Sequence, residues 1–237
     1  MLKINHLSVA IDKQPILKQV KVEFCPGKTY VLMGPNGSGK STLALSILGN
    51  PAYTILRGSQ ILLDGKNITR KAPDERARIG YFLSFQNPLA LSGVSVKDLL
   101  RIALEKKYTP FELSQKITAL AKELKIKDEL LTRSLNDGFS GGEKKKLEAL
   151  QAVLLAPKVA FFDEIDTGVD VDALKIISQF LRKHLPKETT LVFITHSTRL
   201  LKYLKPQRVL VMKDGRILKE GTATLAKKIE TRGFDWI

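Results

Sequence analysis

Eight residues near the start of the chain could bind a phosphate group. Residues 34–41 read GPNGSGKS, which matches the pattern G-x-x-x-x-G-K-[ST]. Glycines let successive backbone N–H groups curl around an anion, and a helix N-terminus that follows adds partial positive charge. Lys40 supplies a cation for the β- and γ-phosphates, and Ser41 offers an oxygen to Mg²⁺. The residues predicted to contact nucleotide in this segment are Gly34, Pro35, Asn36, Gly37, Ser38, Gly39, Lys40, Ser41 and Thr42.

Two acidic residues follow a short apolar run. Residues 159–162 predict a buried strand, and Asp163 and Glu164 come directly after it. Strands of a parallel sheet deliver such residues to their carboxyl edge, where ligands bind in α/β folds. We expect Asp163 near Mg²⁺. Glu164 should point to the other side, because strand side chains alternate, and could orient or deprotonate an attacking water.

A serine and two glycines open a later helical segment. Ser140 is a good N-cap residue, and Gly141 and Gly142 leave backbone N–H groups accessible to an anion. Taken alone, this pattern is equally compatible with an ordinary helix cap.

The elements that must position these residues alternate between strands and helices. Predicted strands cover residues 2–5, 7–11, 16–24, 29–33, 61–63, 67–68, 159–162, 191–195 and 209–212. Predicted helices cover residues 40–48, 96–104, 114–124, 143–155 and 173–184. The pairs Asp64-Gly65 and Asp214-Gly215 predict hairpin turns. This alternation indicates an α/β fold with a largely parallel sheet, and the helical stretch after about residue 87 indicates an inserted subdomain.

The order of these motifs resembles that of the ATP-binding cassette (ABC) ATPases. The Ser140 segment occupies the place of their signature loop, between the helical insertion and Asp163. Gln86 resembles the glutamine of their Q-loop, and residues 166–170 resemble the D-loop. His196, after a predicted strand, resembles the H-loop histidine.

This resemblance implies an architecture and a set of roles. The fold would be a phosphate-loop core with a parallel sheet and an N-terminal antiparallel β subdomain, from residues 1–86 and 157–237, with a helical subdomain at 87–156. Two chains would form an ATP-dependent head-to-tail homodimer, with each ATP between one chain's phosphate loop and the other chain's signature. The implied catalytic residues are Lys40, Gln86, Glu164 as general base and His196. The implied Mg²⁺ ligands are Ser41, Gln86 and Asp163, and the implied further ATP contacts are Ser140, Gly141, Gly142 and Asp166.

The likeness is greatest to one subfamily, the SufC-type ATPases of the SUF iron–sulfur cluster assembly system. The signature at residues 138–146 reads GFSGGEKKK, where transporter cassettes commonly have LSGGQ. Ile165 stands where transporters usually have proline, and the tail at 233–237 reads GFDWI. The resemblance implies a cytoplasmic ATPase that drives conformational change in SufB/SufD-type scaffold proteins. The alternative is the nucleotide-binding subunit of an ABC membrane transporter.

Charge leaves the nature of the partner open. The 237 residues include 39 Lys and Arg but only 24 Asp and Glu, a net charge of +15. Such a balance fits a nucleic-acid, anionic-membrane or acidic-protein partner. The basic residues are dispersed, with residues 144–146 as the densest run, which favours a solvated surface or an acidic protein. We therefore expect no nucleic-acid partner.

Apolar runs and cysteine content exclude further classes. The longest apolar run spans five residues, 152–156, so we expect no transmembrane helix and no direct membrane insertion. The first residues match no targeting pattern. Cys25 is the only cysteine, which excludes an internal disulfide framework.

Overall fold

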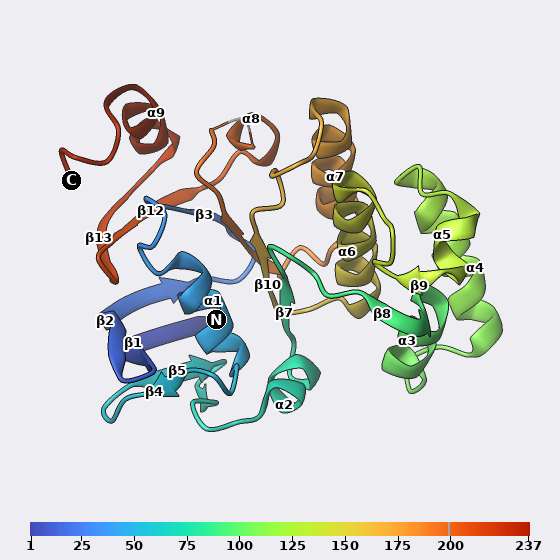
Figure 1. Ribbon diagram of the computed structural model, residues 1–237, viewed down its shortest axis with the longest axis horizontal. Coiled ribbons are helices and arrows are strands. Elements are labelled where there is room, and N and C mark those ends of the chain that lie inside the picture. The colour runs from blue at the N-terminus through green and yellow to red at the C-terminus, as the bar shows by residue number, and fades with distance from the viewer. Residues whose placement is uncertain (199) are drawn as a thin grey trace. The chain divides into compact units, whose positions relative to one another are not determined.

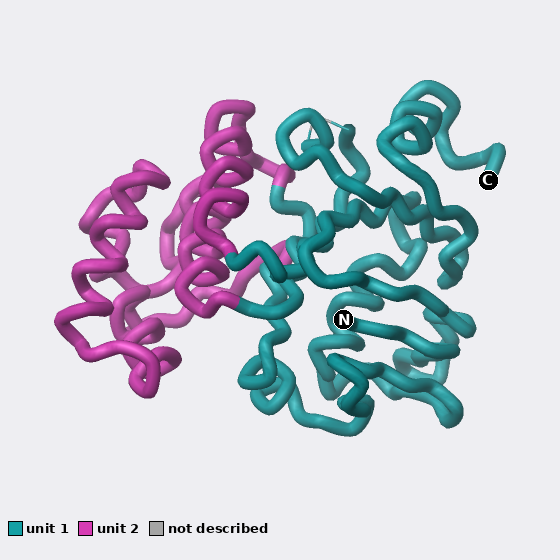
Figure 2. Tube along the Cα trace, turned by 180° about the vertical axis from the view of Figure 1, so that it is seen from behind, with its two compact units in different colours: residues 1–84, 157–165, 186–237 teal, residues 85–156, 166–185 magenta. Residues whose placement is uncertain are grey.

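The computed structural model describes residues 1–198 and 200–237, which divide into two compact units (Figure 2). Unit 1 comprises residues 1–84, 157–165 and 186–237, and unit 2 comprises residues 85–156 and 166–185. The functional division at residues 87 and 156 stays a prediction. Among the described residues, none of the helices has both the length and the apolar character needed to span a membrane.

A six-stranded sheet forms the centre of unit 1, in the order β13-β12-β3-β11-β10-β7 (Figure 1). Its strands are β3 (Thr29–Met33), β7 (Tyr81–Ser84), β10 (Val159–Asp163), β11 (Thr190–Ile194), β12 (Arg208–Lys213) and β13 (Arg216–Gly221). All neighbouring pairs are parallel except β12 and β13. The largely parallel sheet predicted from the sequence is therefore confirmed.

A second, antiparallel sheet is built from the N-terminal part of unit 1. Its strands are β1 (Leu2–Ile11), β2 (Gln14–Phe24), β4 (Thr54–Ile55), β5 (Gln60–Leu63) and β6 (Lys66–Asn67). The prediction of separate strands at 2–5 and 7–11 was wrong, because β1 continues through a bulge at His6, where φ is 50°. The predicted hairpin is confirmed: Asp64 and Gly65 both adopt positive φ, which suits a two-residue turn between antiparallel strands.

Apolar side chains join the two sheets and α1 (Lys40–Leu48) into one core. The Phe24 ring meets Tyr30 edge-on with centroids 5.0 Å apart and Phe161 at 5.5 Å. Leu43 and Ile47 of α1 are fully buried in the same cluster. Burial of each such side chain contributes roughly 1.5–3 kcal/mol, so the helix that follows the phosphate-loop sequence is firmly anchored.

A buried arginine caps the far end of α1. Arg76, on α2 (Pro73–Arg78), is only 2% exposed. Its Nη1 atom donates to the carbonyl oxygens of Ser46 and Ile47 at 2.9 and 2.8 Å. The last carbonyls of a helix lack partners within the helix, so the guanidinium satisfies groups that would otherwise be buried without hydrogen bonds. Burial lowers the pKa of this arginine.

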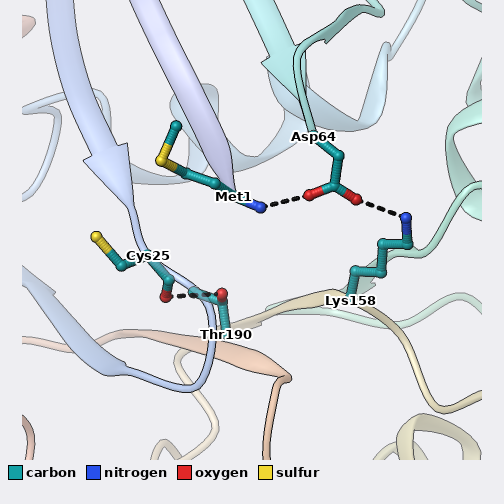
Figure 3. A network of polar contacts seen from close by, with 5 residues as sticks. All are labelled: Met1, Cys25, Asp64, Lys158 and Thr190. Atoms are coloured by element: carbon teal, nitrogen blue, oxygen red, sulfur yellow. Dashed lines mark hydrogen bonds and ion pairs between the residues drawn. The ribbon is translucent and has the colours of Figure 1, made fainter.

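Polar contacts fasten the chain start to the rest of unit 1 (Figure 3). Asp64, in the β5–β6 turn, accepts from the Met1 amine and from Lys158 Nζ, both at 2.5 Å. Nearby, the Thr190 hydroxyl donates to the carbonyl of Cys25 at 3.0 Å. The network thus links the antiparallel sheet to residues that precede β10 and begin β11. Two further helices complete this unit: α8 (Leu201–Leu204) and α9 (Ala223–Arg232).

Unit 2 is mainly helical. Its helices are α3 (Val96–Leu104), α4 (Pro110–Glu123), α5 (Asp128–Thr132), α6 (Gly141–Leu155) and α7 (Val171–His184). A short antiparallel pair, β8 (Leu91–Ser95) and β9 (Ser134–Leu135), was not predicted, because the β8 sequence LSGVS has no apolar run or alternation and β9 has only two residues. Helix α7 belongs to this unit because it packs on α6.

Candidate functional site

The phosphate loop, residues 34–39, connects β3 to α1 in unit 1. Gly37 and Gly39 have φ of 77° and 102°, a conformation that glycine adopts without strain. A Cβ atom on Gly34 would strike the carbonyl oxygen of Met212, so this position tolerates no side chain. The loop therefore needs its glycines for backbone conformation and for close approach to β12. The predicted strand–loop–helix context is confirmed, since both flanking elements have the predicted bounds.

Lys40 lies with its ammonium group held by the loop itself. Its Nζ atom donates to the carbonyl oxygens of Gly34 and Pro35, both at 2.9 Å. The residue is 6% exposed. Burial lowers the pKa of Lys40, and the negative charges of Glu164 and Asp163 partly oppose that shift. The loop thus holds a buried positive charge in the electrostatic field of the two acids.

The turn between β12 and β13 braces the phosphate loop. The Gly215 N–H donates to the carbonyl of Ser38 at 3.0 Å, and the Gly215 carbonyl accepts from Lys18 N–H at 2.9 Å. A Cβ atom on Gly215 would strike the carbonyl oxygen of Ile16, so a glycine is required for this approach. Sequence reasoning found this turn but not its role, because the contact joins segments far apart in the chain.

Ser38 carries the clearest sign of a ligand in the loop. Its hydroxyl oxygen is fully buried and makes no hydrogen bond with the described residues. Buried polar atoms are nearly always hydrogen-bonded in native structures. A phosphate oxygen in the loop would satisfy it.

Strand register gathers the next residues at one sheet edge. Asp163 of β10 pairs with Ile194 of β11, and Ile194 pairs with Leu32 of β3. Asp163 therefore ends β10, while His196 and the phosphate loop follow the carboxyl ends of the neighbouring parallel strands β11 and β3. Asp163 is 4% exposed, which suits a carboxylate with a cationic ligand.

Glu164 lies just beyond β10, where the backbone leaves the strand conformation. Its φ is 49°, and its N–H donates to the carbonyl of Ile194 at 2.9 Å. Strand alternation therefore does not set the direction of Glu164, because β10 ends at Asp163 and the backbone of Glu164 is left-handed. Its Oε1 atom lies 3.7 Å from Nδ1 of the exposed His196. This pair has the residue types for handling a proton and a phosphate.

The signature residues lie in unit 2. The Ser140 hydroxyl caps α6 by accepting from Glu143 N–H at 3.3 Å, and Glu143 Oε2 accepts from Ser140 N–H at 2.8 Å. The Glu143 carboxylate accepts from the Ser140 N–H and from the Ser140 hydroxyl, and these two bonds lower the pKa of Glu143. A Cβ atom on Gly141 would lie 3.1 Å from the Gly168 carbonyl oxygen, whereas one on Gly142 would have no atom of residues 1–198 and 200–237 within 4 Å. The helix start is thus both capped and open at its second glycine.

The remaining predicted residues also belong to unit 2. Gln86 is exposed and follows the end of β7, and Asp166 is half-buried ahead of α7. The structure therefore groups the phosphate loop, Asp163, Glu164 and His196 within unit 1. It places the other predicted site residues in unit 2: Gln86, Ser140, Gly141, Gly142 and Asp166.

Comparison with known proteins finds similarity along the whole chain. A family model described as "ABC transporter" matches residues 17–167. "Probable ATP-dependent transporter ycf16" of Pyropia yezoensis is 42% identical, over 100% of this chain and 97% of that protein. "Vegetative protein 296" of Bacillus subtilis (strain 168) is 43% identical, over 100% and 92% respectively.

A solved structure supports the fold. The dimeric structure of a post-hydrolysis state of the ATP-binding cassette MJ0796, bound to ADP and Pi, matches with a TM-score of 0.79. The match covers 94% of this chain and 99% of that chain at 20% identity. The predicted cassette fold, with its antiparallel β subdomain, parallel core and helices, is confirmed by this likeness.

Proposed function

The chain belongs to the ABC transporter family, and within this family we propose that it is the ATPase subunit of a SUF-type iron–sulfur cluster assembly complex. As a family member it is an ATP-binding ATPase. The finer assignment is supported by the signature GFSGGEKKK at residues 138–146 and by Ile165, both of which differ from the transporter pattern.

In this proposal the phosphate loop and Lys40 bind the phosphates of ATP. The oxygens available beside them suit Mg²⁺, because the Ser41 hydroxyl and the buried Asp163 carboxylate are hard donors. We propose that these two residues hold the ion and that Gln86 joins them. When bound, Mg²⁺ neutralises charge on the β- and γ-phosphates.

Glu164 and His196 would act on the γ-phosphate end of the nucleotide. This part of the proposal is supported by the 3.7 Å distance between Glu164 Oε1 and His196 Nδ1. Both residues lie just beyond the carboxyl ends of β10 and β11, at the edge of the sheet where β3 also leads into the phosphate loop. Glu164 accepts a proton from water, or orients it, and His196 contacts the γ-phosphate.

The second half of each site would come from another copy of the chain. Ser140, Gly141, Gly142 and Asp166 then serve the ATP held by that copy's phosphate loop in a head-to-tail dimer. The open space at Gly142 supports this, since none of the residues that the structure describes lies within 4 Å of a Cβ atom built there. ATP draws two chains together and hydrolysis releases them, which moves the attached scaffold.

A second function is supported by the relatives' names. The Pyropia yezoensis relative is named a probable ATP-dependent transporter. On that basis the chain would be the nucleotide-binding subunit of a membrane transporter, with the same roles for Lys40, Asp163 and Glu164.

Affinity purification from the native cells separates the two functions. A tagged Glu164→Gln chain, held in its ATP-bound form, should retain partners better than the unaltered chain does. We expect mass spectrometry to identify soluble SufB/SufD-type scaffold proteins, and the purified scaffold to stimulate ATP hydrolysis by the unaltered chain. Recovery of an integral membrane permease instead would support the transporter function and contradict the SUF assignment. Untagged cells give the background.

A further inference from the structure

Lys145 and Glu148 form a buried ion pair on α6. Lys145 Nζ lies 3.0 Å from Glu148 Oε2, and the side chains are 5% and 6% exposed. Residues three apart share one face of a helix, so the pair presents one cationic and one anionic group side by side. Burying two charges costs desolvation energy unless further hydrogen bonds use their remaining atoms. The hydrogen bonds that Lys145 and Glu148 make with other groups therefore indicate what the pair stabilises.

Both side chains bind the backbone of Phe85, the residue before Gln86. The Phe85 N–H donates to Glu148 Oε1 at 3.0 Å, and the Phe85 carbonyl accepts from Lys145 Nζ at 2.6 Å. Phe85 is 41% exposed, so its burial is only partial. Hydrogen bonds to charged groups are roughly twice as strong as neutral ones. The ion pair is therefore a backbone clamp, matched in polarity to the N–H and C=O groups of Phe85.

We propose that Lys145 and Glu148 are positioning residues that hold Gln86 in its working orientation toward Mg²⁺. This inference rests on the proposed role of Gln86 as a ligand of the ion. The Phe85 carbonyl and the Gln86 N–H belong to one planar peptide group, so fixing that carbonyl also sets the direction in which Gln86 continues the chain. Helix α6 begins at the Ser140 cap, so one rigid element carries the signature at its start and the Gln86 clamp one to two turns later.

The test removes both charges together, with Lys145→Met and Glu148→Met in one chain. Replacing a buried ion pair by apolar side chains of similar volume is often neutral for stability, whereas removing one partner strands a buried charge. Amide hydrogen exchange of Phe85 is the direct readout. We expect it to be about tenfold faster or more in the double variant, because the bond to a charged acceptor is lost. Lys146→Met, on the same helix, should leave this exchange rate unchanged.

The second readout is the Mg²⁺ requirement. In the double variant, the Mg²⁺ concentration for half-maximal ATP hydrolysis should rise by roughly tenfold or more, as is usual when a group behind a metal ligand is lost. Affinity for ATP without Mg²⁺ should stay the same. Gln86→Ala should raise the Mg²⁺ requirement at least as much, and adding the double substitution to it should change little further.

A reversed pair distinguishes a clamp from a merely structural ion pair. The variant Lys145→Glu with Glu148→Lys keeps the attraction between the side chains but turns a carboxylate toward the Phe85 carbonyl. It should show fast Phe85 exchange and a raised Mg²⁺ requirement, like the double Met variant.

Unchanged Phe85 exchange in the double Met variant would overturn the clamp. Faster exchange with an unchanged Mg²⁺ requirement would overturn the positioning role. If Gln86→Ala itself leaves the Mg²⁺ requirement unchanged, Gln86 is not a ligand of the ion and the positioning role of Lys145 and Glu148 fails with it. The rate of Phe85 amide exchange still tests separately whether the ion pair holds the Phe85 backbone.

Discussion

Oε1 of Glu164 lies 3.7 Å from Nδ1 of His196, and these residues lie just past the carboxyl ends of β10 and β11. The backbone at Glu164 is left-handed, with φ of 49°, and lies just outside β10, so strand alternation does not set the direction of this side chain. A positive φ is uncommon for a residue with a side chain, and such conformations cluster at functional sites. The hydrogen bond from Glu164 N–H to Ile194 keeps the residue tied to the neighbouring strand. The pair is thus held by backbone geometry at the edge of the sheet.

Glu164→Gln should abolish most turnover and spare binding. Glutamine has nearly the same shape but cannot take a proton from water, and loss of a general base costs roughly 10²–10⁴-fold in rate. ATP affinity should change by less than about threefold, since the phosphates are bound elsewhere. Steady-state hydrolysis and equilibrium nucleotide binding measure the two quantities. Glu188→Gln, at an exposed position of unit 1, is the matched control. Near-normal hydrolysis by the Glu164→Gln variant would show that Glu164 is not the general base.

Lys40→Met should weaken nucleotide binding. Methionine retains an apolar stem in the buried position but removes the ammonium group that the Gly34 and Pro35 carbonyls hold. A lost hydrogen bond to a charged group corresponds to roughly a 10–100-fold fall in affinity. Isothermal titration with ATP and Mg²⁺ gives the dissociation constant, and the exposed Lys187→Met is the control. Unchanged affinity and unchanged kinetics together would undo the assignment of Lys40 to the phosphates.

Mixing two impaired chains should raise hydrolysis above their mean if the sites are shared. Ser140→Asp still provides an N-cap for α6 but places a carboxylate where the signature is proposed to meet phosphate. In a head-to-tail dimer with a Lys40→Met chain, one site carries both defects and the other carries neither. The mixture should therefore hydrolyse ATP faster than the mean of the two separate preparations. Activity equal to that mean would contradict a site built from two chains, and Ser140→Thr tests whether the hydroxyl suffices.

Asp64 should make stability depend on pH at the acidic end. Hydrogen bonds from Lys158 and from the Met1 amine hold the pKa of Asp64 below its ordinary value of 3.8. A carboxyl whose pKa is lowered on folding stabilises the folded state above its ordinary pKa, and this contribution disappears as the pH falls through the folded-state pKa. Asp64→Asn should thus lower the free energy of unfolding at neutral pH by about 0.2–1 kcal/mol, the range for partly exposed ion pairs.

Urea unfolding at several pH values measures this effect. The difference between the Asp64→Asn variant and the unaltered chain should shrink as the pH falls below about 4. Asp74→Asn breaks the more exposed pair with Arg78 and should have a smaller effect at neutral pH. A difference that is equally large at low and neutral pH would contradict an electrostatic origin.

Local sequence predicted the elements around the phosphate loop with their observed bounds. β3 and α1 follow from an apolar run, a glycine-rich loop and a helix-forming segment, all of which are legible within about twenty residues. The two Asp-Gly turns were predictable for the same reason, because a two-residue turn requires positive φ and the residue types that adopt it are visible in the local sequence. The strands β8 and β9 were missed, since LSGVS in β8 lacks the apolar run that marks β3 and β9 has only two residues.

The sequence by itself determined which residues could do phosphate chemistry, because residue type and spacing decide what a loop or a strand end can bind. Tertiary structure alone decided how Gly215 braces Ser38 and how Lys145 and Glu148 hold Phe85. Lys145 and Glu148 lie 60 and 63 residues from Phe85 in the sequence, and no periodic pattern in the sequence predicts that they contact it. A buried ion pair gains its hydrogen bonds only when packing excludes water and brings a distant backbone within reach.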